Sequence, residues 1–428
     1  MKEQINIGII GLGTIGCGAL DVLQTNKAEI ERKLGSRVEV VKIADLDITS
    51  ERPVKFDKRL LTTDASEVLE NPEIDIVIEL IGGVHPAKEF VLRALRNGKH
   101  VVTANKELIA KEGAELFEEA AKRNLDLCFE GAVGGGIPII AALKSSLGGN
   151  RIEQVIGIVN GTTNYILTKM SHEGRDFAEV LAEAKAHGYA EPDPTNDIEG
   201  YDARYKIAIL AGIAFTCRVN VDDVYCEGIT KITKRDIENA RELGLAIKLL
   251  AIAKRSGEKV QIRVHPTLIS VDHPLASVND VYNAIYVRGD FVGDVMFYGR
   301  GAGPRPTGSA VAGDVMDIAR NINFGATGRL PCAVLDRCEA QSMDEVATRY
   351  YMRMLVTDRP GVLASIAGVF GEQRVSIGSV IQKDQHGDNA EIVMVTHQVA
   401  ERNFRRAIEL ISKLPVVAEV STWIRVEE

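Results

Sequence analysis

The 428-residue chain lacks several features that would mark its class. Its six cysteines show no CxxC pairing, and scattered cysteines in a long acidic chain favour reduced thiols over disulfides. No apolar run approaches the roughly 18 residues that cross a bilayer. The net charge of −9 argues against a nucleic-acid partner. The opening MKEQINIGIIGLG indicates a charged start and a strand rather than a signal peptide, so we expect a cytoplasmic protein with no membrane partner.

What the chain does have is a strand, a glycine-rich turn and a helix at its beginning. The glycines Gly11, Gly13 and Gly16 fit G-x-G-x-x-G spacing, and a second strand, VEVVKIAD, ends at Asp45. In this context the glycines permit a tight turn, close approach of a pyrophosphate and packing of helix on strand. The pattern predicts a Rossmann-type α/β unit that binds a dinucleotide on the helix N-terminus. The expected binding turn is Gly11, Leu12, Gly13, Thr14, Ile15 and Gly16.

The choice between NAD and NADP stays open. A carboxylate at Asp45 can bind a ribose 2′-hydroxyl and repel a 2′-phosphate. However, Arg52, Lys55 and Lys58 follow closely and could neutralise that phosphate.

A third apolar strand, EIDIVIELIGG, precedes a helix closed by Gly98 and a strand that ends in TANK. Ligands of parallel sheets bind beyond the carboxyl ends of the strands. Thr103, Asn105 and Lys106 are therefore expected near the cofactor. A helix cap at Asn105 with a solvated lysine is the alternative.

Six motifs in order over roughly the first 320 residues resemble the homoserine dehydrogenase family. They are GLGTIG, TANK, EGAVGGGIP, NGTTNYIL, GYAEPDPTNDIEGYDARYK and GAGPRPTGSAV. The resemblance implies an enzyme that interconverts L-homoserine and L-aspartate 4-semialdehyde with NAD(P). Cofactor contacts at Gly188 and Gly303 follow from the same resemblance.

The resemblance implies that Lys206 is the proton donor or acceptor, with Asp202 beside the reacting hydroxyl. Asp202 and Lys206 are four residues apart, so a helix beginning near Tyr201 places them on one face. An ammonium there could stabilise an alkoxide and donate the proton. The alternative is a surface ion pair worth about 0.3–0.5 kcal/mol.

Further substrate contacts are implied at Glu191, which would hold the substrate ammonium, and at Asp197, Thr162 and Thr163. Each could instead be a turn or cap residue. The family also has a sodium-like cation near the glycine cluster. Its implied ligands are Glu130 and the carbonyls of Val133, Gly135 and Ile137, and oxygen-only ligands suit a hard ion.

From Tyr350 onward the order strand, helix, strand, strand, helix, strand predicts a ferredoxin-like module. DRPGVLASIAGVF resembles the start of an ACT domain, an amino-acid-binding regulatory module. Threonine is the expected effector, with contacts at Asp358, Gly361 and Asn389. The alternative is a dimerisation module that has lost its ligand. We expect this tail to fold alone and to imply a homodimer or homotetramer.

The expected fold class is α/β with three domains. These are a Rossmann domain at 1–130 completed by about 306–338, an α+β catalytic and dimerisation domain at 131–305 and an ACT domain at 350–428, and a linker at 339–349 precedes the last of them. A non-enzymatic sensor of dinucleotides and amino acids is an alternative, but no DNA-binding motif supports it. An aldehyde-oxidising dehydrogenase would need an activated cysteine, and neither Cys128 nor Cys217 has a recognisable nucleophile setting.

Overall fold

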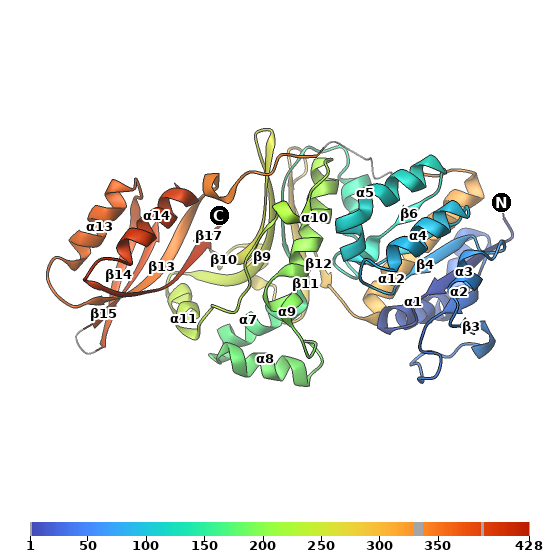
Figure 1. Ribbon diagram of the computed structural model, residues 1–428, viewed down its shortest axis with the longest axis horizontal. Helices are drawn as coiled ribbons and strands as arrows, with labels where there is room; N and C mark the ends of the chain where they lie inside the picture. The colour runs from blue at the N-terminus through green and yellow to red at the C-terminus, as the bar shows by residue number, and fades with distance from the viewer. Residues whose placement is uncertain (1, 329–336, 387–388, 428) are drawn as a thin grey trace. The chain divides into compact units, whose positions relative to one another are not determined.

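The computed structural model describes residues 2–328, 337–386 and 389–427, and Figure 1 shows the order of the elements along the chain. The chain forms two compact units, each assembled from distant segments. Unit 1 comprises residues 1–155, 205–223 and 282–338, and unit 2 comprises residues 156–204, 224–281 and 339–428. Of the segment expected to complete the first domain, residues 329–336 lie outside the described part.

Unit 1 contains a parallel sheet with the strand order β3-β2-β1-β4-β5-β6. This is the order of a Rossmann sheet, which confirms the expected fold class. The strands are β1 (Gln4–Ile10), β2 (Arg37–Ala44), β3 (Leu61–Thr62), β4 (Ile76–Glu79), β5 (His100–Thr103) and β6 (Leu127–Cys128).

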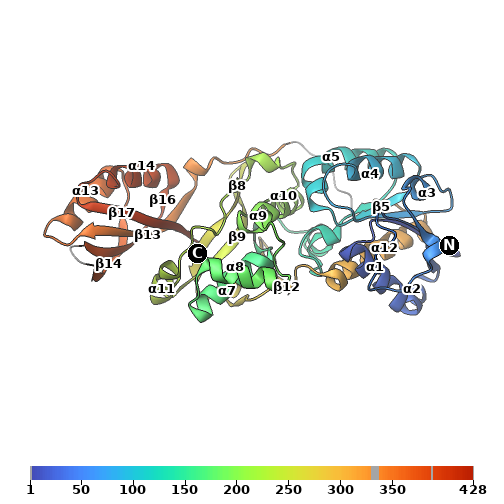
Figure 2. The same cartoon turned by 60° about the horizontal axis from the view of Figure 1, so that its bottom comes forward.

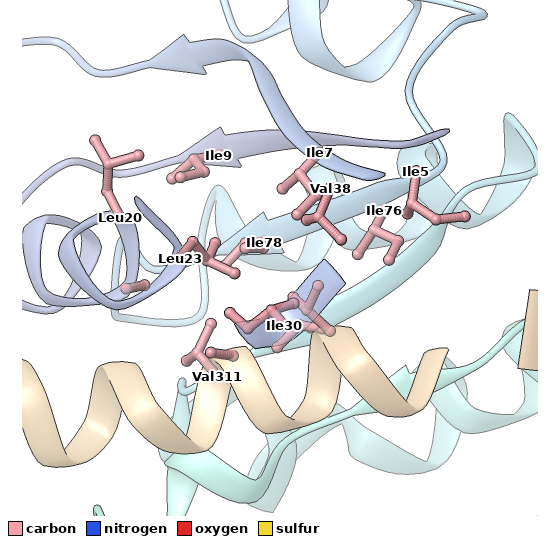
Figure 3. Close-up of a cluster of buried hydrophobic side chains, with 14 of the residues drawn as sticks. Ile5, Ile7, Ile9, Leu20, Leu23, Ile30, Val38, Ile76, Ile78 and Val311 are labelled. Atoms are coloured by element: carbon pink, nitrogen blue, oxygen red, sulfur yellow. The ribbon is translucent and has the colours of Figure 1, made fainter. Parts of the chain in front are cut away.

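Helices cover both faces of this sheet, as parallel strands require. Figure 2 shows α4 and α5 on one face and α1, α2 and α12 on the other. They are α1 (Thr14–Thr25), α2 (Lys27–Leu34), α3 (Ser66–Leu69), α4 (Ala87–Arg96), α5 (Lys106–Lys122) and α12 (Pro304–Phe324). In the core between sheet and helices, Ile7 and Ile9 of β1 pack with Leu20 of α1 and Val311 of α12 (Figure 3).

Helices α1 and α12 touch through glycine. A Cβ on Gly18 would lie 2.0 Å from the carbonyl oxygen of Pro304, and one on Gly308 would lie 2.5 Å from the backbone carbon of Gly18. The returning segment therefore packs backbone to backbone against the first helix of the dinucleotide fold.

The remainder of unit 1 is a set of short elements and a hairpin. Among them are η2 (Glu130–Ala132), α6 (Ile139–Ala141), the π-helical η3 (Ala142–Ser146), β11 (Tyr282–Gly289) and its antiparallel partner β12 (Gly293–Arg300). Two elements, β7 (Ile152–Ile158) and α10 (Tyr201–Phe215), contain residues of both units.

Unit 2 begins with helices and a long antiparallel hairpin. The elements are α7 (Gly161–Glu173), α8 (Phe177–Ala186), α9 (Thr195–Ile198), β8 (Tyr225–Cys226), α11 (Lys234–Glu242), β9 (Leu245–Ser256) and β10 (Lys259–Ser270). Strand β9 pairs with β10 over the full length of both.

The tail has the predicted βαββαβ order, with the sheet order β17-β13-β15-β14. Its elements are β13 (Ala347–Thr357), α13 (Val362–Glu372), β14 (Ile377–His386), β15 (Asn389–Thr396), β16 (Val399–Ala400), α14 (Glu401–Ile411) and β17 (Val417–Val426). Phe370 of α13 and Phe404 of α14 pack with Tyr350 and Met352 of β13, so the two helices share one core with the sheet.

The tail is joined to the middle of the chain by its last strand. β17 pairs with β13 on one side and, in parallel, with β10 on the other. The expected linker is also engaged, because the carbonyl of Glu339 accepts from Val260 N at 3.0 Å and Gln341 N donates to Val260 O at 2.8 Å. The final strand of the tail therefore completes the sheet that β10 begins, and the expectation that the tail folds alone stays a prediction.

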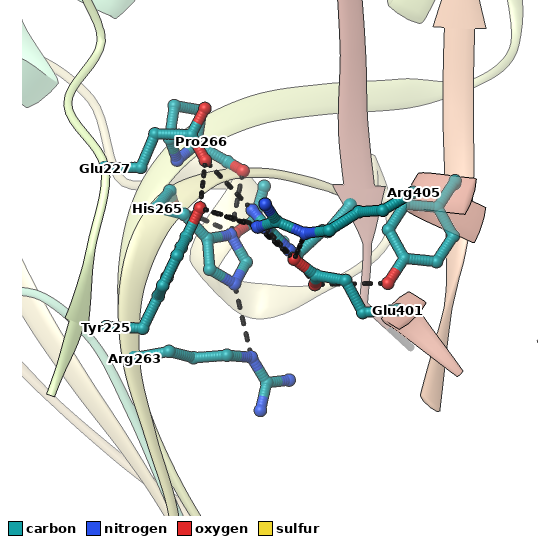
Figure 4. A network of polar contacts seen from close by, with 10 residues as sticks. Tyr225, Glu227, Arg263, His265, Pro266, Glu401 and Arg405 are labelled. Carbon is teal, nitrogen blue, oxygen red and sulfur yellow. Dashed lines mark hydrogen bonds and ion pairs between the residues drawn. The ribbon is translucent and has the colours of Figure 1, made fainter. Parts of the chain in front are cut away.

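Buried charges accompany this strand pairing (Figure 4). Arg425 of β17 donates to Glu401 at 2.7 Å and to Glu227 at 3.1 Å, and Arg263 of β10 pairs with Glu427. Burial lowers the pKa of His265 well below its usual range, so the neutral ring accepts from Arg263 Nε at 3.2 Å. Among the described helices, none combines the length and apolarity that crossing a membrane requires.

Candidate active site

The glycine turn after β1 has the geometry of a dinucleotide cradle. Gly11 has a φ of +97°, and a Cβ on Gly16 would lie 2.1 Å from the Gly11 carbonyl oxygen. A Cβ on Gly13 would meet nothing within 4 Å, so the space in front of the turn is open. Helix α1 begins at Thr14 without a side-chain cap, which leaves N–H groups for an anion. A pyrophosphate therefore fits here.

Asp45 lies at the end of β2, as predicted, and also holds the turn. Its carboxylate accepts from the backbone N–H of Leu12 and, at 2.8 Å, from that of Asp47. Leu12 thus supports the cradle with its N–H instead of offering it to a ligand. Arg52 lies 3.3 Å from Asp45, and its Nε is buried without a partner among the described residues. A guanidinium therefore stands at this position beside the carboxylate.

The residues at the carboxyl ends of β4 and β5 form a buried hydrogen-bond chain. Thr103 Oγ1 donates to Glu79 at 2.6 Å, and the N–H of Asn105 donates to Thr103 Oγ1 at 3.0 Å. Asn105 Oδ1 caps α5 by accepting from Leu108 N at 3.0 Å, so the capping interpretation is correct for this residue. Lys106 is the first residue of α5, at the carboxyl edge where it was expected. Burial raises the pKa of Glu79. The sequence did not single out this residue as part of the site, although it stands at the end of an apolar strand.

The predicted cation ligand Glu130 is buried and already bound. Its carboxylate accepts from Ile140 N at 2.8 Å and from Ala141 N at 2.7 Å, and its own N–H donates to Asp314. The carboxylate therefore stabilises the start of α6. Val133, Gly135 and Ile137 are buried nearby along the chain. Carboxylate and carbonyl oxygens keep lone pairs that suit a hard ion, and the cation site stays a prediction.

In unit 2 a single side chain, Asn160, gathers two predicted substrate carboxylates. Its Nδ2 donates to Asp197 at 2.7 Å and to Asp202 at 2.9 Å. Its Oδ1 caps α7 by accepting from Thr163 N at 2.9 Å. Sequence reasoning did not single out Asn160, because its partners lie 37 and 42 residues away.

The first turn of α7 also reaches the segment before Glu191. Thr162 Oγ1 donates to the carbonyl of Tyr189 at 2.7 Å. Glu191 follows in an exposed turn after α8, and Gly188 has a φ of +72° at the start of that turn. Thr162 thus braces the segment before Glu191, and Thr163 is the residue that the cap Asn160 binds, so both threonines already have structural partners. In unit 1, Gly303 immediately precedes α12 with a φ of +111°.

Helix α10 begins at Tyr201, as predicted, and carries Asp202 and Lys206 one turn apart. The exposed fraction is 6% for Asp202 and 8% for Lys206. A surface ion pair is therefore excluded, since both residues are buried. A buried lysine one turn from a buried carboxylate is a suitable group for proton exchange with a substrate.

Cys128 does not have the setting of a nucleophile. Desolvation raises the pKa of its thiol well above the usual range, which disfavours the reactive thiolate. The aldehyde-oxidising alternative loses this candidate.

The predicted effector residues lie together in the tail. Gly361, with a φ of +89°, precedes α13, and Asp358 accepts from Gln382 at 3.2 Å. Asn389 pairs with Thr357, the neighbour of Asp358. Asp358 and Asn389 are thus brought to the same end of β13.

The dinucleotide cradle and the buried pair of Asp202 and Lys206 on α10 define an oxidoreductase that uses a dinucleotide. Three family models match the chain: the homoserine dehydrogenase NAD-binding domain at 11–130, homoserine dehydrogenase at 138–316 and the ACT domain at 350–416. A homoserine dehydrogenase from Synechocystis is 47% identical, with 99% of each chain covered. The chain belongs to the homoserine dehydrogenase family.

Solved structures agree with this assignment. A homoserine dehydrogenase from Thiobacillus denitrificans is 43% identical with a TM-score of 0.93, covering 100% of this chain and 99% of its own. A hyperthermophilic archaeal homoserine dehydrogenase in complex with NADPH is 30% identical with a TM-score of 0.62. That match covers 74% of this chain and 97% of the archaeal one.

Proposed function

We propose that the chain catalyses the NAD(P)-dependent interconversion of L-homoserine and L-aspartate 4-semialdehyde. The observation that carries the proposal is the bonding of buried Asn160 to half-buried Asp197 and buried Asp202, with the buried Lys206 one turn along α10. Family membership supports an enzyme over the alternative of a non-enzymatic sensor. Purified protein mixed with homoserine and NAD or NADP should change the nicotinamide absorbance, and silence with both cofactors would overturn the proposal.

Different residues of the chain perform proton transfer and substrate binding. A bound nicotinamide would supply the hydride acceptor or donor. The amine of Lys206 takes the hydroxyl proton when homoserine is oxidised and returns it when the aldehyde is reduced. Asn160 fixes Asp202 beside this lysine and Asp197 beside the substrate. Glu191, exposed in the turn after α8, provides an anion for the substrate ammonium.

We propose that both NAD and NADP are accepted. Asp45 suits a ribose 2′-hydroxyl, while Arg52 places a guanidinium next to it that can pair with a 2′-phosphate. The NADPH complex of the archaeal relative is consistent with the second use.

We propose that threonine inhibits the enzyme through the tail. Asp358, Asn389 and the helix start after Gly361 could bind the ammonium and carboxylate of an amino acid. Asp358→Ala should keep activity and lose inhibition by millimolar threonine. Full-length enzyme that ignores threonine, or a variant inhibited equally, would contradict the assignment and favour a dimerisation role.

We propose a homodimer or homotetramer. On β12, Met296 is 40% exposed and Tyr298 is 55% exposed, so apolar side chains are available for a second copy. Light scattering on the purified protein tests this, and a monomer would contradict it.

A further inference from the structure

Lys248 is a buried lysine that the proposed chemistry does not use. It lies in β9 with 4% of its surface exposed. Its Nζ is 2.6 Å from the carbonyl of Val278, 3.1 Å from Asn279 Oδ1 and 3.5 Å from Asn164 Oδ1, the last at the outer limit of a hydrogen bond. Three oxygens thus face the three N–H groups of one ammonium.

The partner Asn164 ties the same loop to helix α7. Its Nδ2 donates to the carbonyl of Val278 at 3.2 Å and to that of Asp280 at 3.0 Å. A further hydrogen bond joins the loop to α7, because Asp280 N donates to Thr168 Oγ1 at 3.0 Å. Lys248 therefore belongs to a hydrogen-bond network that joins β9, the 278–280 loop and the first turns of α7.

One turn before Asn164, the N-terminus of α7 contacts the proposed substrate carboxylates. Asn160, the cap of α7, bonds Asp197 and Asp202, and Thr162 bonds the carbonyl of Tyr189 ahead of Glu191. A lysine is expensive to bury, and an apolar side chain of similar length would fill the space at lower cost. Its presence is explained if the oxygens it holds must stay in one place.

We propose that Lys248 is a positioning residue. It fixes the start of α7 through Asn164 and the 278–280 loop. In this way it holds Asn160, and the carboxylates that Asn160 binds, in the position that the substrate requires. This inference rests on the proposed function. The effect should fall on substrate binding and turnover, and spare the cofactor, whose glycine turn lies in unit 1.

The test compares two lysine-to-methionine changes on the same strand. Lys248→Met removes the ammonium from the hydrogen-bond network, whereas the control Lys254→Met removes an ion pair with Glu427. We expect kcat/KM for homoserine to fall about 10- to 100-fold in Lys248→Met, with the KM for NAD(P) unchanged, because small misplacements at a site have effects of this size. Lys254→Met should keep kcat/KM for homoserine, and Lys248→Arg should restore part of it.

Two further measurements keep the inference testable. Asn279→Ala removes one acceptor from a half-buried loop position and should lower kcat/KM in the same direction even if Lys248→Met does not fold. Hydrogen exchange of residues 161–168 should speed up in Lys248→Met and not in Lys254→Met. Unchanged homoserine kinetics, an equal loss in Lys254→Met, or a loss shared by the cofactor KM would overturn the inference. Wild type without homoserine activity would reject the proposed function, while hydrogen exchange would still judge the role of Lys248.

Discussion

At the scale of single residues, we expect turnover to depend most on Lys206. Lys206→Ala should reduce kcat by about 10²–10⁴-fold, the usual contribution of a positioned acid–base group. The KM for NAD(P) should change little, because the role proposed for the lysine is on the substrate oxygen. Steady-state kinetics with both substrates measures this.

The control for that change is Lys122→Ala. Lys122 forms an exposed ion pair with Glu118, so its loss should leave kcat unchanged. A Lys206 variant that retained near-full turnover would show that the buried lysine has a structural role only.

Arg52 should set how well the enzyme distinguishes its two cofactors. In Arg52→Ala the KM for NADP should rise about tenfold or more relative to that for NAD, because a charge-assisted contact to the 2′-phosphate is lost. Kinetics with each cofactor at saturating homoserine gives the ratio. An equal change for both cofactors would mean that Arg52 only braces Asp45 and Asp47.

Lys248 should make stability depend on pH. Burial lowers its pKa from 10.5 to about 8, so between these values the unfolded chain binds more protons than the folded one. Stability from this group therefore rises with pH across that window, by about 3 kcal/mol at most. Thermal unfolding of wild type relative to Lys248→Met should show wild type gaining between pH 8 and 10.5. A difference that is constant over this range would contradict the buried, titrating lysine.

At the scale of elements, two glycines of α12 allow a matched comparison of a crowded and an open position. Gly308→Ala places a methyl group against the backbone of Gly18, and overpacking of this kind destabilises by about 1–3 kcal/mol or more. Gly313→Ala, on the same helix, meets nothing within 4 Å and should stabilise by about 0.5–1 kcal/mol. Denaturant unfolding distinguishes the two, and similar effects for both would show that α1 and α12 are not in close contact in solution.

Local patterns predicted the elements well and their long-range partners poorly. The apolar run before Gly11 and the acidic start of α10 place β1 and Tyr201 correctly, because strand and helix periodicity are read over a few residues. The role of Asn160 depends on side chains 37 and 42 residues away, which no local pattern encodes. Capping at Asn105 was foreseen as an alternative because an N-cap acts within three residues.

At the scale of the whole molecule, the tail is tied to the catalytic region by buried charge. The sequence of the tail predicts its own fold, but the pairing of β17 with β10 depends on residues some 160 positions apart, as in the 164-residue separation of Arg263 and Glu427. Deleting residues 417–428 should therefore remove more than regulation. Arg263 would be left buried without its partner, and breaking such a pair destabilises by about 3–5 kcal/mol.

We expect this deletion to abolish soluble expression or to lower the thermal midpoint sharply, with activity lost in proportion. Glu409→Ala, which removes a surface partner of Arg406 in the same module, is the control and should have little effect. A soluble, fully active protein without β17 would show that the strand is dispensable to unit 2.

The position of β17 also affects how the protein is made. The strand that separates β10 from β13 follows both of them in sequence, so neither neighbour can complete its pairing until residues 417–426 have left the ribosome. Until then, both present unpaired strand edges of the kind that invite association between chains. Emergence of β17 is thus the event that lets unit 2 close, and nascent chains crowded on one messenger would be the form of this protein most exposed to aggregation.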